Sequence, residues 1–313
     1  GWPALFFINV PLGILALVLA SRALPVDRPR PAAGRGGFDH PGTVLLALTL
    51  AAYAFAMTLG RGSFGALNVA LLLVTTAGAV LFVFAEARAA SPLIQLGMFR
   101  NPVLSAGFAG SVLVTTVVMA TLVVGPFHLS GALGLDAAGV GLVMSVGPAI
   151  AALAGVPAGR LVDRLGAQRM SVVGLTVMAT GAVTLATLPA SFGVPGYVIP
   201  LAFVTAGYAL FQAANNTAIM TNVGADQRGV TSGLLTLSRN LGLITGASVM
   251  GTVFAIGSAT DDVLTASPAS VAAGTRLTFV VAAMLILIAL AITARRYSCP
   301  DHPTCRHERP YNP

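Results

Sequence analysis

Long apolar stretches with almost no charged residues follow one another along the chain. Between residues 170 and 225 there is no Asp, Glu, Lys or Arg. Shorter charge-free stretches cover 3–20, 42–60, 66–85, 101–127, 137–159, 240–260 and 277–294. A helix needs about 20 apolar residues to cross roughly 30 Å of hydrocarbon, so these stretches have the length of membrane spans. They are continuously apolar and lack the alternation of a barrel wall, and therefore predict transmembrane helices.

The stretch 170–225 is too long for one span. It contains Pro189, Pro195, Gly196 and Pro200, which cannot all lie inside one regular helix, so it predicts two helices. The chain is therefore expected to be an all-α polytopic membrane protein with nine transmembrane helices. Their expected ranges are 3–20, 42–60, 66–86, 102–127, 137–160, 170–188, 196–221, 229–257 and 275–295.

Composition supports a membrane location. Of 313 residues 56% are apolar and 9% are charged, and the mean hydropathy is +0.87, whereas a soluble domain carries about 25% charged residues. Most soluble enzyme classes are thereby excluded. A membrane enzyme would need a catalytic cluster at a membrane face, and the four His and ten acidic residues show none. We expect no enzyme activity, no cofactor and no metal site.

The basic residues lie between the predicted spans. A net charge of +7 would suggest a nucleic-acid partner in a soluble protein, but here the charge follows the helix connections, so none is expected. All 17 basic residues are Arg. Successive helix connections lie on opposite sides of the membrane, and this places Arg61 and Arg276 on one side. The other side receives Arg22, Arg28, Arg30, Arg35, Arg88, Arg100, Arg160, Arg164, Arg169, Arg228, Arg239, Arg295, Arg296, Arg306 and Arg309.

This asymmetry predicts the orientation of the chain. Cytoplasmic loops carry an excess of basic residues, so the Arg-rich side is predicted to be cytoplasmic and the C-terminus with it. Gly1 is then expected to start on the outside. The sequence opens with Gly1-Trp2-Pro3 directly against an apolar stretch, with neither an initiator Met nor a basic segment before it. A preceding portion is therefore expected.

Five segments carry a family resemblance. They read GWPALFFINVPLG at 1–13, FDHPG at 38–42, PLIQLGMFRN at 92–101, GRLVDRLGAQR at 159–169, and RGVTSG with SRNLG within 228–242. In this order they resemble the sixth helix, the entry to the linker helices, the lead into the C-terminal bundle, the loop motif and the penultimate helix of one family. That family is the 14-helix drug:proton antiporters of the major facilitator superfamily.

The resemblance implies a partial major facilitator fold. Residues 1–21 would be the last helix of an N-terminal bundle, 22–41 a cytoplasmic loop, 42–87 two linker helices, and 88–101 a second cytoplasmic loop. The C-terminal six-helix bundle would cover 102–296, and 297–313 would be a disordered cytoplasmic tail. Roughly five helices of the N-terminal bundle would lie upstream and are implied as a partner of this chain.

The family also implies a function. The chain would belong to a plasma (inner) membrane transporter that exports small amphipathic drugs or metabolites by alternating access, with protons as the coupling ion. No acidic residue lies near the middle of any predicted span, and the family places its main coupling acid in the N-terminal bundle. Two alternatives stay open: a truncated membrane fragment that does not transport, and an importer of a small metabolite.

The motif at 159–169 is the candidate gating loop, with Gly159, Asp163, Arg164, Gly166 and Arg169 as its members. The two glycines would permit close backbone approach. Asp163 could lie against a neighbouring helix N-terminus or pair with Arg164 or Arg169. The alternative is a basic loop whose charges only set the topology.

The candidate substrate pathway combines polar residues of two helices. Gln212, Asn215 and Asn216 are spaced three to four apart, which predicts one shared face that lines a cavity or bonds a neighbouring helix. Arg239 would lie deep in the eighth helix, where an intramembrane cation marks a functional site, or would reach the interface with its long side chain. In the same helix Gly242 and Gly246 predict a packing seam.

Two further features concern titration and metals. His128 could take part in proton coupling because its reference pKa is about 6.5, although a lone His at a helix end is commonly an interfacial residue. It stands near the position where the family often has Gln. The tail contains Cys299, His302, Cys305 and His307, but their spacing matches no standard zinc finger, so reduced thiols in a disordered tail are expected.

Overall fold

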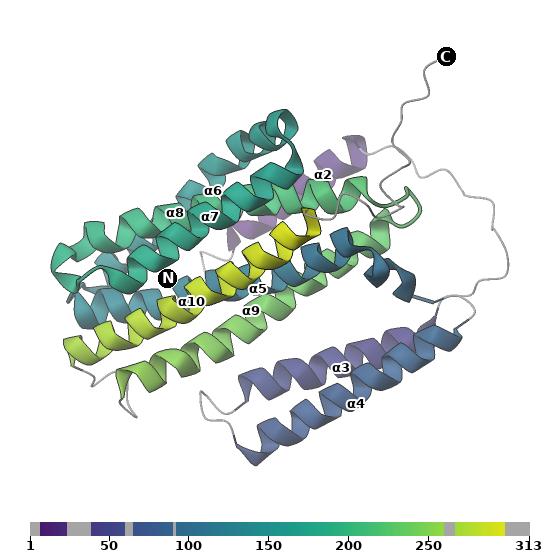
Figure 1. The fold of residues 1–313 in the computed structure, drawn as a ribbon, viewed down its shortest axis with the longest axis horizontal. Helices are drawn as coiled ribbons and strands as arrows, with labels where there is room; N and C mark the ends of the chain where they lie inside the picture. The colour runs from purple at the N-terminus through teal and green to yellow at the C-terminus, as the bar shows by residue number, and fades with distance from the viewer. Residues whose placement is uncertain (1–6, 24–38, 60–64, 90–91, 260–266, 298–313) are drawn as a thin grey trace. The chain divides into compact units, whose positions relative to one another are not determined.

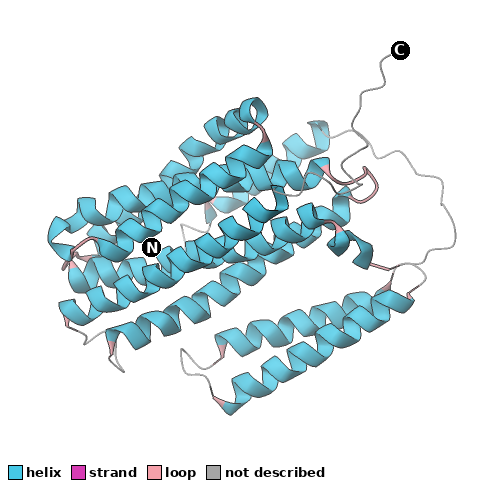
Figure 2. Cartoon of the chain, in the orientation of Figure 1, coloured by secondary structure: helices cyan, strands magenta, loops and turns pink. Residues whose placement is uncertain are grey.

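The computed structural model describes residues 7–23, 39–59, 65–89, 92–259 and 267–297, and the described part is helical without any strand (Figures 1 and 2). Eight of the described helices are long and apolar enough to cross a membrane. The all-α membrane fold is thus confirmed. The helices are α2 (Asn9–Ala23), α3 (His40–Thr58), α4 (Ala66–Arg88), α5 (Pro102–Phe127), α6 (Ala137–Leu165), α7 (Ala167–Thr187), α8 (Gly193–Thr221), α9 (Arg228–Ser258) and α10 (Pro268–Tyr297).

Three short helices stand beside the long ones: the 3-10 helix η1 (Leu96–Arg100), the π-helical turn η2 (His128–Ala132) and the 3-10 turn η3 (Ala190–Phe192). Residues 1–38 form one compact unit and residues 39–313 another. The first unit contains α2, which has 15 residues, none of them buried. The tail with its Cys and His residues lies outside the described residues, as does the start of the predicted helix 3–20.

Most predicted helix bounds agree with the structure, but α6 ends at Leu165 and not at 160, and three helices, α7, α8 and α10, begin three to seven residues earlier than predicted. The stretch 170–225 does break into two helices, but α8 already begins at Gly193 and includes Pro195, Gly196 and Pro200. Pro195 lies in the first helical turn, where a missing backbone N–H has no intrahelical partner to lose. The last helix begins at Pro268 and not at 275. Its first turns extend beyond the apolar stretch and include Arg276, whose side chain is exposed.

Side-chain caps explain where three helices start. The Asp39, Asn101 and Asp136 carboxylate or amide oxygens accept hydrogen bonds from the backbone N–H groups of Gly42, Val103 and Gly139, at 2.9, 2.8 and 2.9 Å. Each cap satisfies one of the backbone donors that a helix start leaves without a partner. Proline follows the cap in α3 and α5, where its fixed φ suits the first turn.

Helices α5 to α10 form one bundle (Figure 1). The most extensive contacts join α7 with α8 and α5 with α9, while α10 packs on α5, α7 and α9, and α6 packs mainly on α8. The largest buried cluster fills the middle of the bundle and includes Val114, Met178, Tyr197 and Phe279. Helix α6 buries little of its length, so it stands at the margin of this core.

Glycines bring two helix pairs into backbone contact. A Cβ on Gly207 of α8 would lie 2.6 Å from the Gly174 carbonyl oxygen and from the Met178 backbone nitrogen of α7. Between α5 and α9, a Cβ on Gly246 would lie 2.7 Å from the Thr116 carbonyl oxygen, and the Thr116 hydroxyl donates to the Gly242 carbonyl at 3.1 Å. The packing seam predicted at Gly242 and Gly246 is therefore confirmed.

Helices α3 and α4 form an antiparallel pair, called here the linker hairpin. On α3 the buried residues are Gly42, Thr49 and Ala56, a seven-residue repeat that makes one narrow seam. Thr49 packs directly against Gly78 of α4. The hairpin contacts the bundle through the Tyr53 and Thr245 hydroxyls and through a second apolar cluster, which includes Phe82, Ile94, Met98, Phe108 and Leu235.

Candidate transport site

A polar group connects α8 and α9 inside the bundle. The Arg239 guanidinium of α9 donates a hydrogen bond to the Asn216 amide oxygen of α8. One and two turns before Asn216 lie Gln212 and Tyr208. The Tyr208 hydroxyl interacts with the Gln212 side chain and with the charge of Arg239. We call Tyr208, Gln212, Asn216 and Arg239 the α8–α9 polar group.

Arg239 lies well inside its helix. Because α9 begins at Arg228, Arg239 is about 16 Å along the axis at a rise of 1.5 Å per residue. Its side chain is half-buried and meets an uncharged amide. Helix α9 has 31 residues and exceeds the thickness of the hydrocarbon core, so both interpretations of Arg239, an intramembrane cation and an interfacial one, fit this position.

Asn215 does not share a face with this group. Its amide nitrogen donates to the Gly107 carbonyl at 3.0 Å and to the Ser111 hydroxyl at 2.9 Å, so it joins α8 to α5 and is buried. Of the two predicted uses of these residues, cavity lining or bonding to a neighbouring helix, Asn215 has the second. Adjacent helical positions are about 100° apart, and the fold assigns Asn215 to the α5 side and Asn216 to the α9 side.

The segment 159–169 is a tight corner between two helices. Helix α6 continues to Leu165, Gly166 has a φ of 88°, and α7 starts at Ala167. This left-handed conformation suits glycine and explains Gly166. The close backbone approach expected at Gly159 and Gly166 is not found, since a Cβ at either position would meet no described atom within 4 Å.

The charged members of the corner point outward. Asp163, Arg164 and Arg169 are exposed, and no ion pair joins Asp163 to either arginine. The pairing considered for Asp163 is therefore absent among the described residues. Its carboxylate belongs to the last turn of α6, two residues before the helix ends at Leu165, and is exposed.

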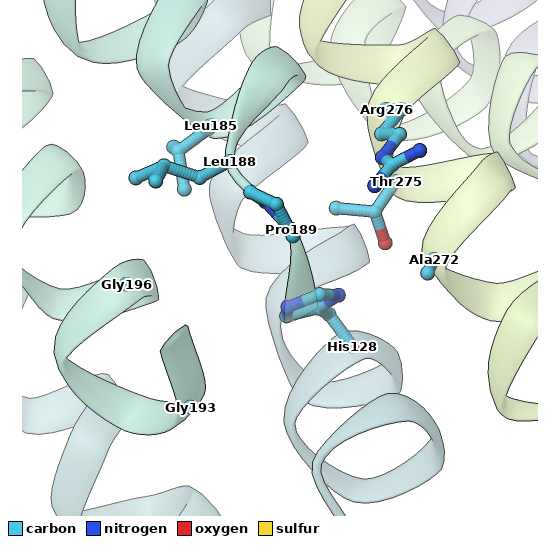
Figure 3. Close-up of a pocket in the computed structure, with 9 residues that line it drawn as sticks. All are labelled: His128, Leu185, Leu188, Pro189, Gly193, Gly196, Ala272, Thr275 and Arg276. Atoms are coloured by element: carbon cyan, nitrogen blue, oxygen red, sulfur yellow. The ribbon is translucent and has the colours of Figure 1, made fainter. Parts of the chain in front are cut away.

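His128 lines a small cavity where four elements meet (Figure 3). The cavity has a volume of about 20 Å³ and is bordered by the end of α7, the start of α8 and Thr275 and Arg276 of α10. The His128 ring stacks on Tyr197 with centroids 5.6 Å apart. Its Nδ1 atom is buried and has no hydrogen-bond partner among the described residues. The cavity is large enough for one water molecule.

Two polar residues of interest were missed at the sequence level. Tyr208 precedes Gln212 by four positions, which is the spacing of one helix face and could have been found. Glu86 is the last residue of the predicted span 66–86, and no pattern in the sequence marks it as buried. It is 3% exposed. In the described part of the chain no group of three or more potential metal ligands occurs.

The comparisons with known proteins agree with this architecture. A sequence model of the Major Facilitator Superfamily matches residues 1–247. A crystal structure of a mutant of the nucleoside transporter NupG has the same fold, with a TM-score of 0.53 and 14% sequence identity, covering 81% of this chain and 65% of that one. The chain belongs to the Major Facilitator Superfamily, whose members are membrane transporters.

Three curated relatives indicate the range of functions in similar sequences. An uncharacterized transporter, YebQ of Escherichia coli, is 31% identical over 96% of this chain and 62% of its own length. The riboflavin transporter RibZ of Clostridioides difficile is 29% identical over 82% of this chain and 55% of its own. The multidrug efflux pump LfrA of Mycolicibacterium smegmatis is 26% identical over 81% and 50%. The chain thus spans about half to three fifths of these relatives.

Proposed function

We propose that this chain is the C-terminal portion of a plasma-membrane exporter that moves small amphipathic compounds by alternating access. The observation that carries the proposal is the α8–α9 polar group: a half-buried cation and three side chains able to form hydrogen bonds, which lie together in a bundle whose core is mostly apolar. An amphipathic substrate can place its polar part there and its apolar part against the surrounding helices. The relationship to the efflux pump LfrA supports export of drug-like compounds.

The proposal includes protons as the coupling ion. The bilayer-spanning helices described here hold no acid near the middle of a span, so the main coupling carboxylate is assigned to an N-terminal bundle that would pair with this chain. His128 is the candidate titrating group of this portion, because its buried Nδ1 can accept a proton or a hydrogen bond. The Arg-rich connections and the C-terminus are assigned to the cytoplasmic side.

The corner around Gly166 is proposed as the gate. Gly159, Gly166, Arg164 and Arg169 shape and flank it, and the exposed Asp163 carboxylate would form a contact in only one access state. That contact would favour the state in which it forms, since an interaction shifts a conformational equilibrium only through a difference between the states.

The first experiment measures ethidium export by the full-length protein in cells with Arg239→Gln. Loss of the cation should lower the export rate at least tenfold, which corresponds to about 1.4 kcal/mol. The matched control is Arg228→Gln, since Arg228 is exposed at the start of the same helix. Export at the wild-type rate by Arg239→Gln, at equal membrane abundance, would remove the α8–α9 polar group from the pathway.

The second experiment tests the gate with Asp163→Asn. The variant should export ethidium more slowly while its melting temperature stays unchanged, because Asp163 has no partner to lose within the described chain. Asp226→Asn is the control, as Asp226 is an exposed acid in the turn before α9. Equal export by Asp163→Asn and wild type would leave the corner with a topological role only.

Import of a small metabolite is the second candidate, and the relationship to the riboflavin transporter RibZ supports a metabolite as the substrate. Membrane vesicles of both orientations separate the two directions. Substrate accumulation in inside-out vesicles supports export, accumulation in right-side-out vesicles supports import, and accumulation in neither supports a membrane protein that does not transport.

A further inference from the structure

A groove lies where the start of α7 meets the end of α10, beside the corner around Gly166. Its volume is about 550 Å³. One water molecule takes roughly 30 Å³, so the groove is far larger than a site for a single water or a small inorganic ion. Its surface is almost entirely apolar, and two polar side chains line it as well. The side chains that matter here are the apolar Met170, Val172 and Val173 and the polar Gln168 and Arg169.

The polar and apolar parts of the groove are ordered along α7. Gln168 and Arg169 lie in the first turn of this helix, and Val172 and Val173 lie about one turn further into the span. Helix α10 contributes Ala294, next to the end of its own span. The groove therefore starts at the membrane interface and continues into the hydrocarbon region. A phospholipid has its parts in the same order, with a charged headgroup at the interface and acyl chains below it.

The interfacial end of the groove is positively charged. Arg169 lines it, is exposed and has no ion pair among the described residues. Two further exposed arginines stand next to lining residues in the chain, since Arg164 precedes Leu165 and Arg295 follows Ala294. An anionic group at this end would therefore meet several cations.

The start of α7 adds to this positive charge. Its N-cap is Gly166, which offers no side-chain cap, and its first turn contains no acidic residue. The positive end of the helix dipole is thus not neutralised by the helix itself. The acid nearest in the chain, Asp163, is exposed and does not line the groove.

The C-terminal segment of the chain is a poor match for the groove. Helix α10 ends at Tyr297, and residues 298–313 contain no Val, Leu, Ile, Met or Phe. Such a segment has few side chains to place against an apolar wall. The bilayer, in contrast, surrounds both spans and supplies hydrocarbon chains to their surfaces.

We propose that this groove binds an anionic phospholipid. One acyl chain lies against Met170, Val172 and Val173, and the phosphate accepts hydrogen bonds from the Arg169 guanidinium and the Gln168 amide. Basic pockets between transmembrane helices on the cytoplasmic side bind anionic headgroups, and the arginine distribution assigns this end of the bundle to that side. The lipid joins α7 to α10 and is separate from the α8–α9 polar group.

Native mass spectrometry of the purified full-length protein tests the headgroup contact, with phosphatidylglycerol and phosphatidylcholine as the added lipids. The wild type should bind phosphatidylglycerol at least tenfold more tightly, because several arginines face its net charge. Arg169→Gln should weaken phosphatidylglycerol binding about fivefold, which corresponds to about 1 kcal/mol. Arg228→Gln is the control, since Arg228 is exposed on the same assigned side and does not line the groove. It should bind both lipids like the wild type.

Val173→Trp tests the acyl-chain contact in the same measurement. Val173 is 42% exposed, so a larger side chain can extend into the groove and should weaken the binding of both lipids at least fivefold. Val183→Trp is the control, because Val183 is 47% exposed on the same helix and lies outside the groove. All four substituted side chains are exposed, and melting temperatures in detergent verify that the variants fold.

Two outcomes would overturn the proposal. Equal weakening by Arg169→Gln and Arg228→Gln, or equal binding of the two lipids by the wild type, would show a diffuse attraction of bilayer lipids. Weakening by Arg169→Gln together with unchanged binding by Val173→Trp would show an anion held without its acyl chain. Binding is measured without transport, so the result does not depend on the export proposed above.

Discussion

The six-helix bundle and the linker hairpin use equally apolar helices in different ways. In the most apolar window of α5 and of α7, 61% and 56% of the residues are buried, against 17% in α3 and 11% in α4. The bundle helices contact several neighbours, with glycine bringing backbones together. The hairpin has one narrow seam, and polar side chains stand at its two ends. Hydropathy alone therefore does not predict which helices pack.

Helix α6 shows the same lesson within the bundle. Its window has a mean hydropathy of 1.9, above the 1.6 of α7, yet only 6% of it is buried. In a bilayer an exposed apolar side chain is as well solvated by lipid as by protein, so burial reflects contact geometry and not hydrophobicity. Four tests probe this contrast, beginning with the largest expected effect.

The largest effect is expected from Gly207→Val at the α7–α8 crossing. The new Cβ would collide with the Gly174 carbonyl and the Met178 N–H, which are backbone atoms and cannot move independently. Overpacking of this kind should lower the free energy of unfolding by about 3 kcal/mol. Thermal unfolding in detergent measures it, with Gly155→Val in α6 as the control, because nothing lies within 4 Å of that site. Equal losses in both variants would contradict the contrast.

Asn215→Leu should have the next largest effect. It removes two hydrogen bonds between α8 and α5 and leaves the Gly107 carbonyl and the Ser111 hydroxyl without this donor. Interhelical hydrogen bonds in membranes contribute about 0.6 to 1.7 kcal/mol each, so a loss of about 1–2 kcal/mol is expected in the same unfolding measurement. Asn240→Leu, at an exposed position of α9, should change little. No loss in Asn215→Leu would mean that the α5–α8 contact rests on packing alone.

Asn68→Leu tests the hairpin at the end opposite Glu86. The Asn68 amide donates to the Ala56 carbonyl at 2.7 Å and to the Leu59 carbonyl, and so joins α4 to the end of α3. Its loss should weaken the hairpin by about 1 kcal/mol. Hydrogen exchange should then increase in α3 and α4 and stay unchanged in α7, because the hairpin contacts the bundle mainly through α9 and η1 rather than through α7. A uniform increase would show that hairpin and bundle unfold together.

The smallest effect is expected in α6. Leu142 and Leu153 are 74% and 77% exposed, so Leu142→Ala and Leu153→Ala should each change the unfolding free energy by no more than about 0.5 kcal/mol. The same thermal unfolding assay measures both. A loss above about 1 kcal/mol in the full-length protein would mean that this face of α6 is packed there against other protein.

Much of the helix layout was predictable because span length and charge placement are local properties. The range 102–127 agrees with α5, and the Gly242 and Gly246 seam followed from spacing alone. The predicted start of α8 at 196 was wrong, and the helix begins at Gly193, because proline is tolerated in the first helical turn. The separation of Asn215 from Asn216 could not be predicted, since spacing does not say which neighbour stands on each side.

The amino-acid sequence by itself determined that this protein is a bundle of membrane-spanning helices and where most of them begin and end. The bilayer requires the same apolar length and the same placement of flanking charges from every span, so each span can be predicted from its own residues. The tertiary structure decided which polar side chains meet. Asn216 meets Arg239, and Asn215 meets Gly107 and Ser111, because helix crossings bring together residues that are distant in the chain and no local pattern records those crossings.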